Sequence, residues 1–146
     1  GDHRDLHSFP PRRSSDLDYV LLLPFQPRER LPEMLAAADV GLIVQKSNVV
    51  AFNMPSKTQV LLASGRAIIA SVPGSGTAAR AVRSSEGGLV VEPESPQALL
   101  DAVLTLAENR DRTTTLGKHG RAYAEKTYSF ESALNAYEAL FKKLCQ

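Results

Sequence analysis

Residues 40–71 read VGLIVQKSNVVAFNMPSKTQVLLASGRAIIAS, and this stretch decides the fold. The apolar run from Val40 to Val44 is typical of a strand buried on both faces, and Ala67 to Ser71 is a second such run. Between them, a polar loop leads to Pro55, a residue type that is favoured in the first turn of a helix. A strand, a helix and a second strand form one crossover of a parallel sheet. Ligands of such sheets bind at the carboxyl ends of the strands, so the loop after the first strand is the candidate site.

The rest of the chain repeats the alternation of strands and helices. Short apolar runs bounded by proline or glycine predict further strands at residues 18–23 and 89–91. Helical spacing and starting residues predict helices over residues 28–38, 55–64, 77–84 and 112–126, and from residues 95 and 129 onward. The fold class is therefore α/β, a Rossmann-like parallel sheet of about four strands with flanking helices and a C-terminal helical tail. We expect one apolar face of the last helix to pack against the core. This seam consists of Phe130, Leu134, Tyr137, Phe141 and Leu144.

The composition limits the classes of function. With 146 residues, 43% of them hydrophobic, the chain is one domain, or one domain plus a tail. Its net charge of +1 argues against nucleic-acid binding, which needs a basic face. No apolar run approaches the roughly 18 residues of a membrane-spanning helix. The single cysteine, Cys145, fits a cytoplasmic protein, and a peripheral position at the inner membrane face is compatible with it. Because Cys and His do not cluster, we expect no metal site.

Residues 1–17 differ in character from the rest of the chain. They show no apolar periodicity, and their arginines and aspartates balance. The run from Asp5 to Leu17 resembles the peptide that results when sequencing adapter is translated at the end of an assembled read. We therefore expect residues 1–17 to be a non-native or disordered tail and residues 18–146 to be the domain, with a native linker as the alternative.

The helix start at Pro55 has the groups that an anion needs. The first backbone N–H groups of a helix have no partner within it, and that end has about half a positive charge. Ser56 adds a hydroxyl and Lys57 adds an ammonium. Reactions that expel a nucleoside diphosphate need such groups, because negative charge grows on the leaving phosphate. An ordinary helix start with a solvated lysine is the simpler interpretation of the same residues.

Several segments are informative together: DVGLIV at residues 39–44, MPSK at 54–57, LASGRAIIA at 62–70 and GLVVEP at 88–93. In order and spacing they resemble the C-terminal, donor-binding domain of a GT-B glycosyltransferase, over about residues 19–141. The similarity is greatest to family-4 enzymes of bacterial exopolysaccharide and colanic-acid synthesis. It implies that this half binds a nucleoside-diphosphate sugar as substrate, with no metal or other cofactor. A separate N-terminal domain of the same protein would hold the acceptor, and a fragment without that domain would be inactive.

Carried over by position, the resemblance implies a set of donor-binding residues. The sugar and the diphosphate of the donor would be lined by Gln45, Asn53, Met54, Pro55, Ser56 and Lys57. Pro24 and Phe25 would lie near the base, and the catalytic residues are not identified. Many family-4 enzymes have two glutamates eight positions apart. Here Phe52 and Val60 stand at the matching positions, and neither side chain accepts a hydrogen bond.

Two other functions stay open. Gly74, Gly76 and Ala79 satisfy the G-x-G-x-x-G/A spacing between a strand and a helix, as in NAD(P)-binding oxidoreductase domains, and Glu92 ends the next strand. A turn that uses glycine for its backbone freedom explains the same residues. The other alternative is a flavodoxin-like interaction domain without a ligand, which would have an inert strand edge.

Overall fold

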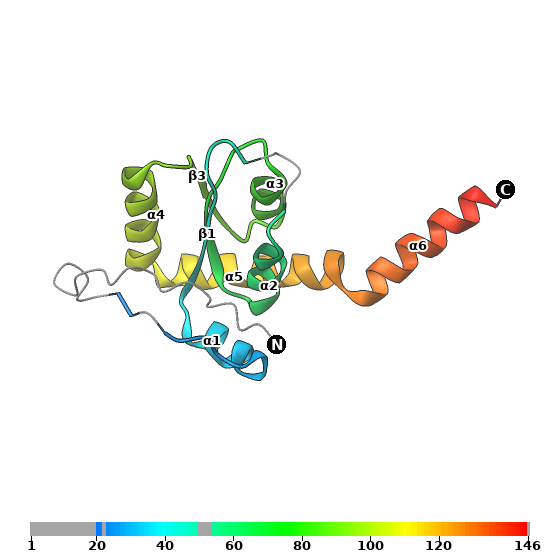
Figure 1. Ribbon diagram of the computed structural model, residues 1–146, viewed down its shortest axis with the longest axis horizontal. Helices are drawn as coiled ribbons and strands as arrows, with labels where there is room; N and C mark the ends of the chain where they lie inside the picture. Colours follow the sequence, from blue (N-terminus) through cyan, green and yellow to red (C-terminus); the bar gives the residue numbers. More distant parts are fainter. Residues whose placement is uncertain (1–19, 22, 50–53, 146) are drawn as a thin grey trace, which may run out of the picture.

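The computed structural model describes residues 20, 21, 23–49 and 54–145, and in this part strands and helices alternate along the chain (Figure 1). The elements are η2 (Arg28–Arg30), α1 (Leu31–Ala37), β1 (Val40–Val44), α2 (Ser56–Ser64), β2 (Ala67–Ser71), α3 (Thr77–Ser84), β3 (Gly88–Val91), α4 (Pro96–Glu108), α5 (Arg110–Tyr128) and α6 (Phe130–Leu144). The predicted α/β class with a C-terminal helical tail is confirmed.

The three strands form one parallel sheet in the order β1-β2-β3. In its register, Val40 lies opposite Ala67, and Ile68 lies opposite Gly88. Of the strand predicted at residues 18–23, the structure describes Val20, Leu21 and Leu23, and none of these is in a strand. The described sheet therefore has three strands rather than about four. Those three side chains are exposed, and an apolar run becomes a stable strand only where a neighbouring strand pairs with it.

Helices cover the two faces of the sheet unevenly. On one face, α2, α3 and α5 enclose the main core, which includes Ile43, Leu62 and Ile68. On the other face, α4 packs Ala102 and Leu106 against β2. Figure 1 shows α4 on one side of the strands and α2 and α3 on the other. The strand at the centre, β2, is buried at every position, as its continuous apolar run indicates.

α5 crosses beneath the sheet in Figure 1 and packs very closely against the end of α2. A Cβ atom placed on Gly117 would lie 2.1 Å from the carbonyl oxygen of Gly65. Gly65 itself ends α2 with a φ of 72°, in the left-handed region that glycine enters without strain. Two glycines therefore allow one helix to rest on the end of the other.

α6 extends away from the body of the molecule (Figure 1). Its apolar seam is present, but α6 has no buried residue, and Phe130 is 85% exposed. The prediction that this seam faces the core was wrong for the described chain, because α6 contacts only α5 appreciably among the other elements. None of the helices in the described ranges has the length and apolar character that crossing a membrane requires.

Candidate functional site

The three strands end at one edge of the sheet, and three loops leave from it. The N–H of Gln45 donates to the carbonyl oxygen of Ser71 (2.9 Å), and the N–H of Val72 donates to that of Val91 (3.3 Å). The Ser71 hydroxyl also donates to the carbonyl oxygen of Glu92, at 3.3 Å. These bonds align the ends of β1, β2 and β3, so the loops that follow them begin side by side.

The loop after β1 is tied to the loop after β3. Residues Lys46 to Val49 form a turn in which the N–H of Val49 donates to the Lys46 carbonyl oxygen (3.2 Å). The N–H of Ser47 donates to Oε2 of Glu94 at 3.1 Å, and the Ser47 hydroxyl donates to the same oxygen. The pKa of Glu94 is lowered, mainly by the hydrogen bond from the Ser47 hydroxyl and next by the bond from the Ser47 N–H. The positive charge of nearby Lys46 also lowers this pKa.

α2 follows this loop in the chain, and its first residues differ in exposure. Met54 and Pro55 are half-buried, whereas Ser56 and Lys57 are exposed. Pro55 is the N-cap and has no side chain that could accept a hydrogen bond from the first turn. The N–H of Thr58 donates to the Pro55 carbonyl oxygen at 2.9 Å. Thr58 is fully buried, and its hydroxyl has no hydrogen-bond partner among the described groups.

A second helix starts at the same edge, after the loop that follows β2. Gly76 is the N-cap of α3, its N–H donates to the Pro73 carbonyl oxygen (2.9 Å), and it likewise offers no side-chain cap. The Arg83 guanidinium donates to the carbonyl oxygen of Gly74 and so closes the loop onto α3. Neither Gly74 nor Gly76 has a positive φ, so the turn does not depend on the backbone freedom of glycine. Two helices without side-chain caps thus begin near one edge, an arrangement that suits an anion.

Residues 1–109 match the family described as Glycosyl transferases group 1. The chain belongs to this family. Its fold is similar to that of sucrose-phosphate synthase from Thermosynechococcus elongatus, with a TM-score of 0.69 and 24% sequence identity. That alignment covers 87% of this chain but only 30% of the synthase, and it supports the predicted fold as one half of a GT-B architecture. No curated protein sequence matches the chain significantly.

In this group 1 glycosyl transferase chain, the structure brings some of the predicted site residues together and not others. Met54, Pro55, Ser56 and Lys57 are contiguous at the start of α2, and Gln45 follows β1 at the aligned edge. Asn53 and Phe52 lie outside the described residues. Val60 is 37% exposed on α2, so its side chain is not a core residue.

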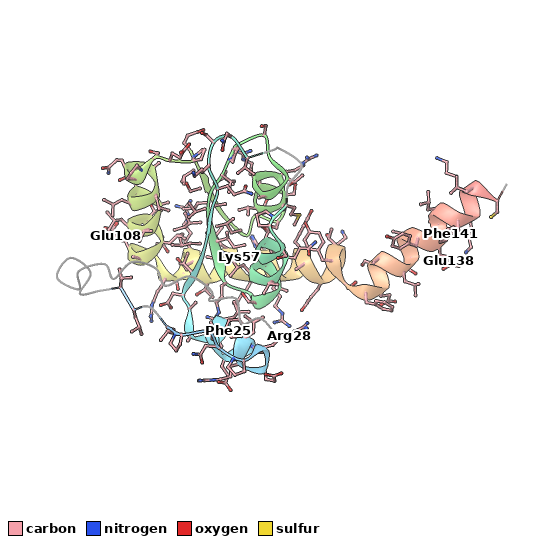
Figure 2. All side chains as sticks on the ribbon, viewed as in Figure 1. Phe25, Arg28, Lys57, Glu108, Glu138 and Phe141 are labelled. Atoms are coloured by element: carbon pink, nitrogen blue, oxygen red, sulfur yellow. The ribbon has the colours of Figure 1, made fainter. Side chains whose placement is uncertain are left out.

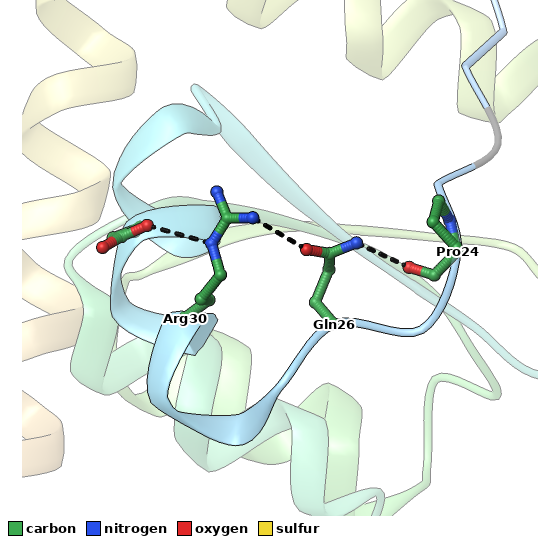
Figure 3. Close-up of polar contacts among 4 residues, drawn as sticks. Pro24, Gln26 and Arg30 are labelled. Atoms are coloured by element: carbon green, nitrogen blue, oxygen red, sulfur yellow. Dashed lines mark hydrogen bonds and ion pairs between the residues drawn. The ribbon is translucent and has the colours of Figure 1, made fainter.

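Pro24 and Phe25 lie elsewhere in the described fold. Figure 2 shows Phe25 on the turn that leads to α1, and α1 ends shortly before the amino end of β1. The Gln26 amide donates to the Pro24 carbonyl oxygen (3.0 Å), and Arg30 donates to Oε1 of Gln26 (3.0 Å) and to Glu33 (3.3 Å), as Figure 3 shows. Phe25 is 98% exposed. The described fold therefore does not bring these two residues to the start of α2.

Sequence reasoning missed the contact between Ser47 and Glu94 and also a cavity at the opposite edge. The cavity has a volume of about 800 Å³ and lies between the starts of β1 and β2, the end of α4 and the first half of α5. Its lining includes Arg66, Arg110 and Lys118, and the Arg110 guanidinium lies 4.0 Å from Oδ1 of Asp39. These residues come from separate segments, so no motif in the sequence marks them. The described part of the chain has no cluster of three or more His, Cys, Asp or Glu residues suited to a metal ion.

Proposed function

We propose that this chain is the donor-binding half of a glycosyltransferase and binds a nucleoside-diphosphate sugar at the carboxyl edge of its sheet. The observation that supports this most directly is the start of α2, where the exposed Lys57 stands in an N-terminal turn without a side-chain cap. Membership of the Glycosyl transferases group 1 family makes a sugar transfer the relevant reaction. The aligned loops after β1, β2 and β3 supply the polar edge at which parallel sheets bind ligands.

The proposed chemistry depends on charge at the leaving group. In the transfer, the bond between the sugar and the diphosphate breaks and the diphosphate keeps the electron pair. A bond from the sugar to the acceptor oxygen forms, and the acceptor hydroxyl releases its proton to the solvent. Negative charge therefore grows on the diphosphate in the transition state, where fixed positive groups stabilise it. The Lys57 ammonium and the N-terminal end of α2 would supply that charge, and Ser56 would add a hydroxyl donor.

Other residues would position the donor. Asn53, Met54 and Pro55 would lie along the sugar, with Gln45 approaching from the end of β1. Pro24 and Phe25 would lie beside the base only if the turn that leads to α1 moved toward the carboxyl edge of the sheet when the donor binds. Because Lys57 and the helix end supply positive charge, we propose that the donor binds without a metal.

A second domain of the same protein would complete the enzyme. It would hold the acceptor, and we expect the present chain alone to bind the donor without transferring the sugar. The finer role, in bacterial polysaccharide synthesis within the cytoplasm or at the inner face of its membrane, is part of this proposal.

The test is a titration of the chain with UDP, GDP and NAD, followed by amide chemical shifts. We expect UDP or GDP to shift the amides of Ser56 and Lys57, and Lys57→Ala to weaken binding about tenfold, the effect of losing one charged contact of roughly 1.4 kcal/mol. Lys118→Ala is the matched control, since it removes the same charge at the opposite edge and should leave the affinity unchanged.

Each other outcome of the titration contradicts the proposal in a different way. If only NAD binds, with shifts between Gly74 and Ala79, the chain is a dinucleotide-binding domain. If no nucleotide binds at millimolar concentration, this half does not bind the donor by itself. Equal losses in Lys57→Ala and Lys118→Ala would mean that affinity follows net charge and not the start of α2.

A further inference from the structure

Glu94 is the residue that joins two loops of the candidate site. It lies between β3 and α4, and Ser47 lies between β1 and α2. One oxygen, Oε2, accepts both the N–H of Ser47, at 3.1 Å, and the Ser47 hydroxyl. A carboxylate that accepts two hydrogen bonds from one residue fixes both the backbone and the side chain of that residue.

The backbone of Glu94 also has an uncommon conformation. Its φ is 59°, one of two positive values among the described residues other than glycine. This left-handed conformation is uncommon for a residue with a side chain and needs support from the surroundings. The contact with Ser47 is such a support. The next residue, Ser95, starts α4 as its N-cap and accepts the N–H of Ala98 (3.3 Å), so the conformation of Glu94 is also fixed from that side.

The turn that Glu94 anchors comes directly after Gln45, a proposed donor-binding residue. From Gln45 the chain continues through the turn at Lys46 to Val49 toward Met54 and the start of α2. In the described part of the chain between Gln45 and the start of α2, the contact of Ser47 with Glu94 is the hydrogen-bonded link to another loop. A loop held in one conformation before the ligand arrives loses less freedom on binding than a loop that must first be ordered.

We propose that Glu94 is a positioning residue that anchors the turn from Lys46 to Val49 through Ser47 and so holds the carboxyl end of β1 ready for the donor. The inference rests on the proposed function, because it concerns the affinity of the same edge for a nucleoside diphosphate. In this arrangement Glu94 acts through Ser47, which donates two hydrogen bonds to its Oε2.

The first measurement is the affinity of the chain for UDP in the variants Glu94→Gln, Glu94→Ala and Ser47→Ala. If the loop spends only a tenth to a third of its time in the competent position without the anchor, the Kd rises by about three- to tenfold. Ser47→Ala removes only the hydroxyl bond and should have the smaller effect, whereas Glu94→Ala removes both bonds. A double variant with both alanines should therefore bind no more weakly than Glu94→Ala alone. Ser47→Ala leaves α4 untouched and therefore separates the anchor from any effect on the start of that helix. Glu92→Gln is the control, because Glu92 is a nearby exposed carboxylate whose side chain forms no hydrogen bond or ion pair with the described residues.

The second measurement is a pH titration of the Ser47 amide chemical shift without any nucleotide. The pKa of Glu94 is lowered from its ordinary value of 4.5, chiefly by the Ser47 hydroxyl. The contact is therefore complete at neutral pH and is lost as the pH falls through that lowered pKa. The shift should follow this titration in the wild-type chain and should be absent in Glu94→Gln.

These two measurements separate the possible failures. Unchanged UDP affinity in all three single variants, in a chain that binds UDP, overturns the positioning role alone. A wild-type chain that does not bind UDP overturns the proposed function. A Ser47 shift that does not respond to Glu94→Gln overturns the anchor itself.

Discussion

Gly117→Ala tests the close approach of α5 to the end of α2. The added Cβ would lie 2.1 Å from the carbonyl oxygen of Gly65 and 2.9 Å from its carbonyl carbon. Non-bonded heavy atoms prefer separations of about 3.5 Å, so α5 and the end of α2 would have to move apart by about 1 Å or more. Both partners are backbone atoms, and a rotamer change cannot relieve the clash.

The expected loss follows from two opposing effects. Overpacking a well-packed contact costs about 1–3 kcal/mol, and the absence of a flexible partner places this site at the upper end. Alanine is favoured over glycine within a helix by about 1 kcal/mol, which offsets part of that loss. The net destabilisation is therefore about 2 kcal/mol. With a urea slope of about 2 kcal/mol per molar, the unfolding midpoint should fall by about 1 M.

The assay is urea unfolding followed by circular dichroism, with two further variants of α5. Gly120→Ala places its Cβ 3.0 Å from a methyl carbon of Leu62, a flexible side chain, and should change stability by less than about 1 kcal/mol. Ala122→Gly changes an exposed position of the same helix and so measures only the difference in helix propensity between alanine and glycine. It should lower the free energy of unfolding by about 1 kcal/mol. A Gly117→Ala variant as stable as the parent would show that α5 does not rest on Gly65 in solution.

Two more substitutions test the ends of α2. Gly65→Ala should lose about 1–2 kcal/mol of stability in the same urea assay, because alanine is strained at a φ of 72°. If Gly65→Ala lowers the free energy of unfolding by less than about 0.3 kcal/mol, α2 does not end in the left-handed conformation. Thr58→Val should gain about 1 kcal/mol, because the buried hydroxyl has no partner among the described groups and valine has the same shape. A loss of stability would instead show that this hydroxyl is hydrogen-bonded in solution.

Much of the fold could be predicted from local signals. The bounds of β1, β2 and α3 agree with the apolar runs and the flanking glycines and prolines, and β3 begins one residue before its predicted start. The apolar run of β2 is buried at every position, as expected for the central strand of a parallel sheet covered by helices. The equally apolar run of β1, at the edge of the sheet, leaves Leu42 and Val44 exposed. For these elements the local pattern and the tertiary structure require the same conformation.

The exceptions are the segments whose neighbours the local pattern cannot specify. Residues 18–23 and the seam of α6 are as apolar as the buried elements, yet their described side chains are exposed. An apolar residue gains free energy by leaving water, but the sequence does not say which surface will cover it. Exposure at these two places follows from what lies beside them and not from their own composition.

In the candidate site, too, some features could be predicted from the sequence and others could not. The start of α2, from Met54 to Lys57, could be predicted because a proline, a hydroxyl and a lysine are consecutive and their helix follows a strand. The contact of Ser47 with Glu94 could not, because the two residues are distant in the sequence and each alone is an ordinary loop residue. Their meeting requires β1 and β3 to lie on either side of β2 with their ends aligned.

The sequence by itself determined the alternation of strands and helices, the parallel sheet and the helix start that the proposed donor would use. Those features depend on side-chain period, turn residues and capping, which act over a few neighbours in the chain. Only the tertiary structure decided which loops meet at the carboxyl edge, how closely Gly117 approaches Gly65, and which apolar surfaces stay exposed. These depend on contacts between residues far apart in sequence, and such contacts arise only once the sheet has paired and the helices have packed on it.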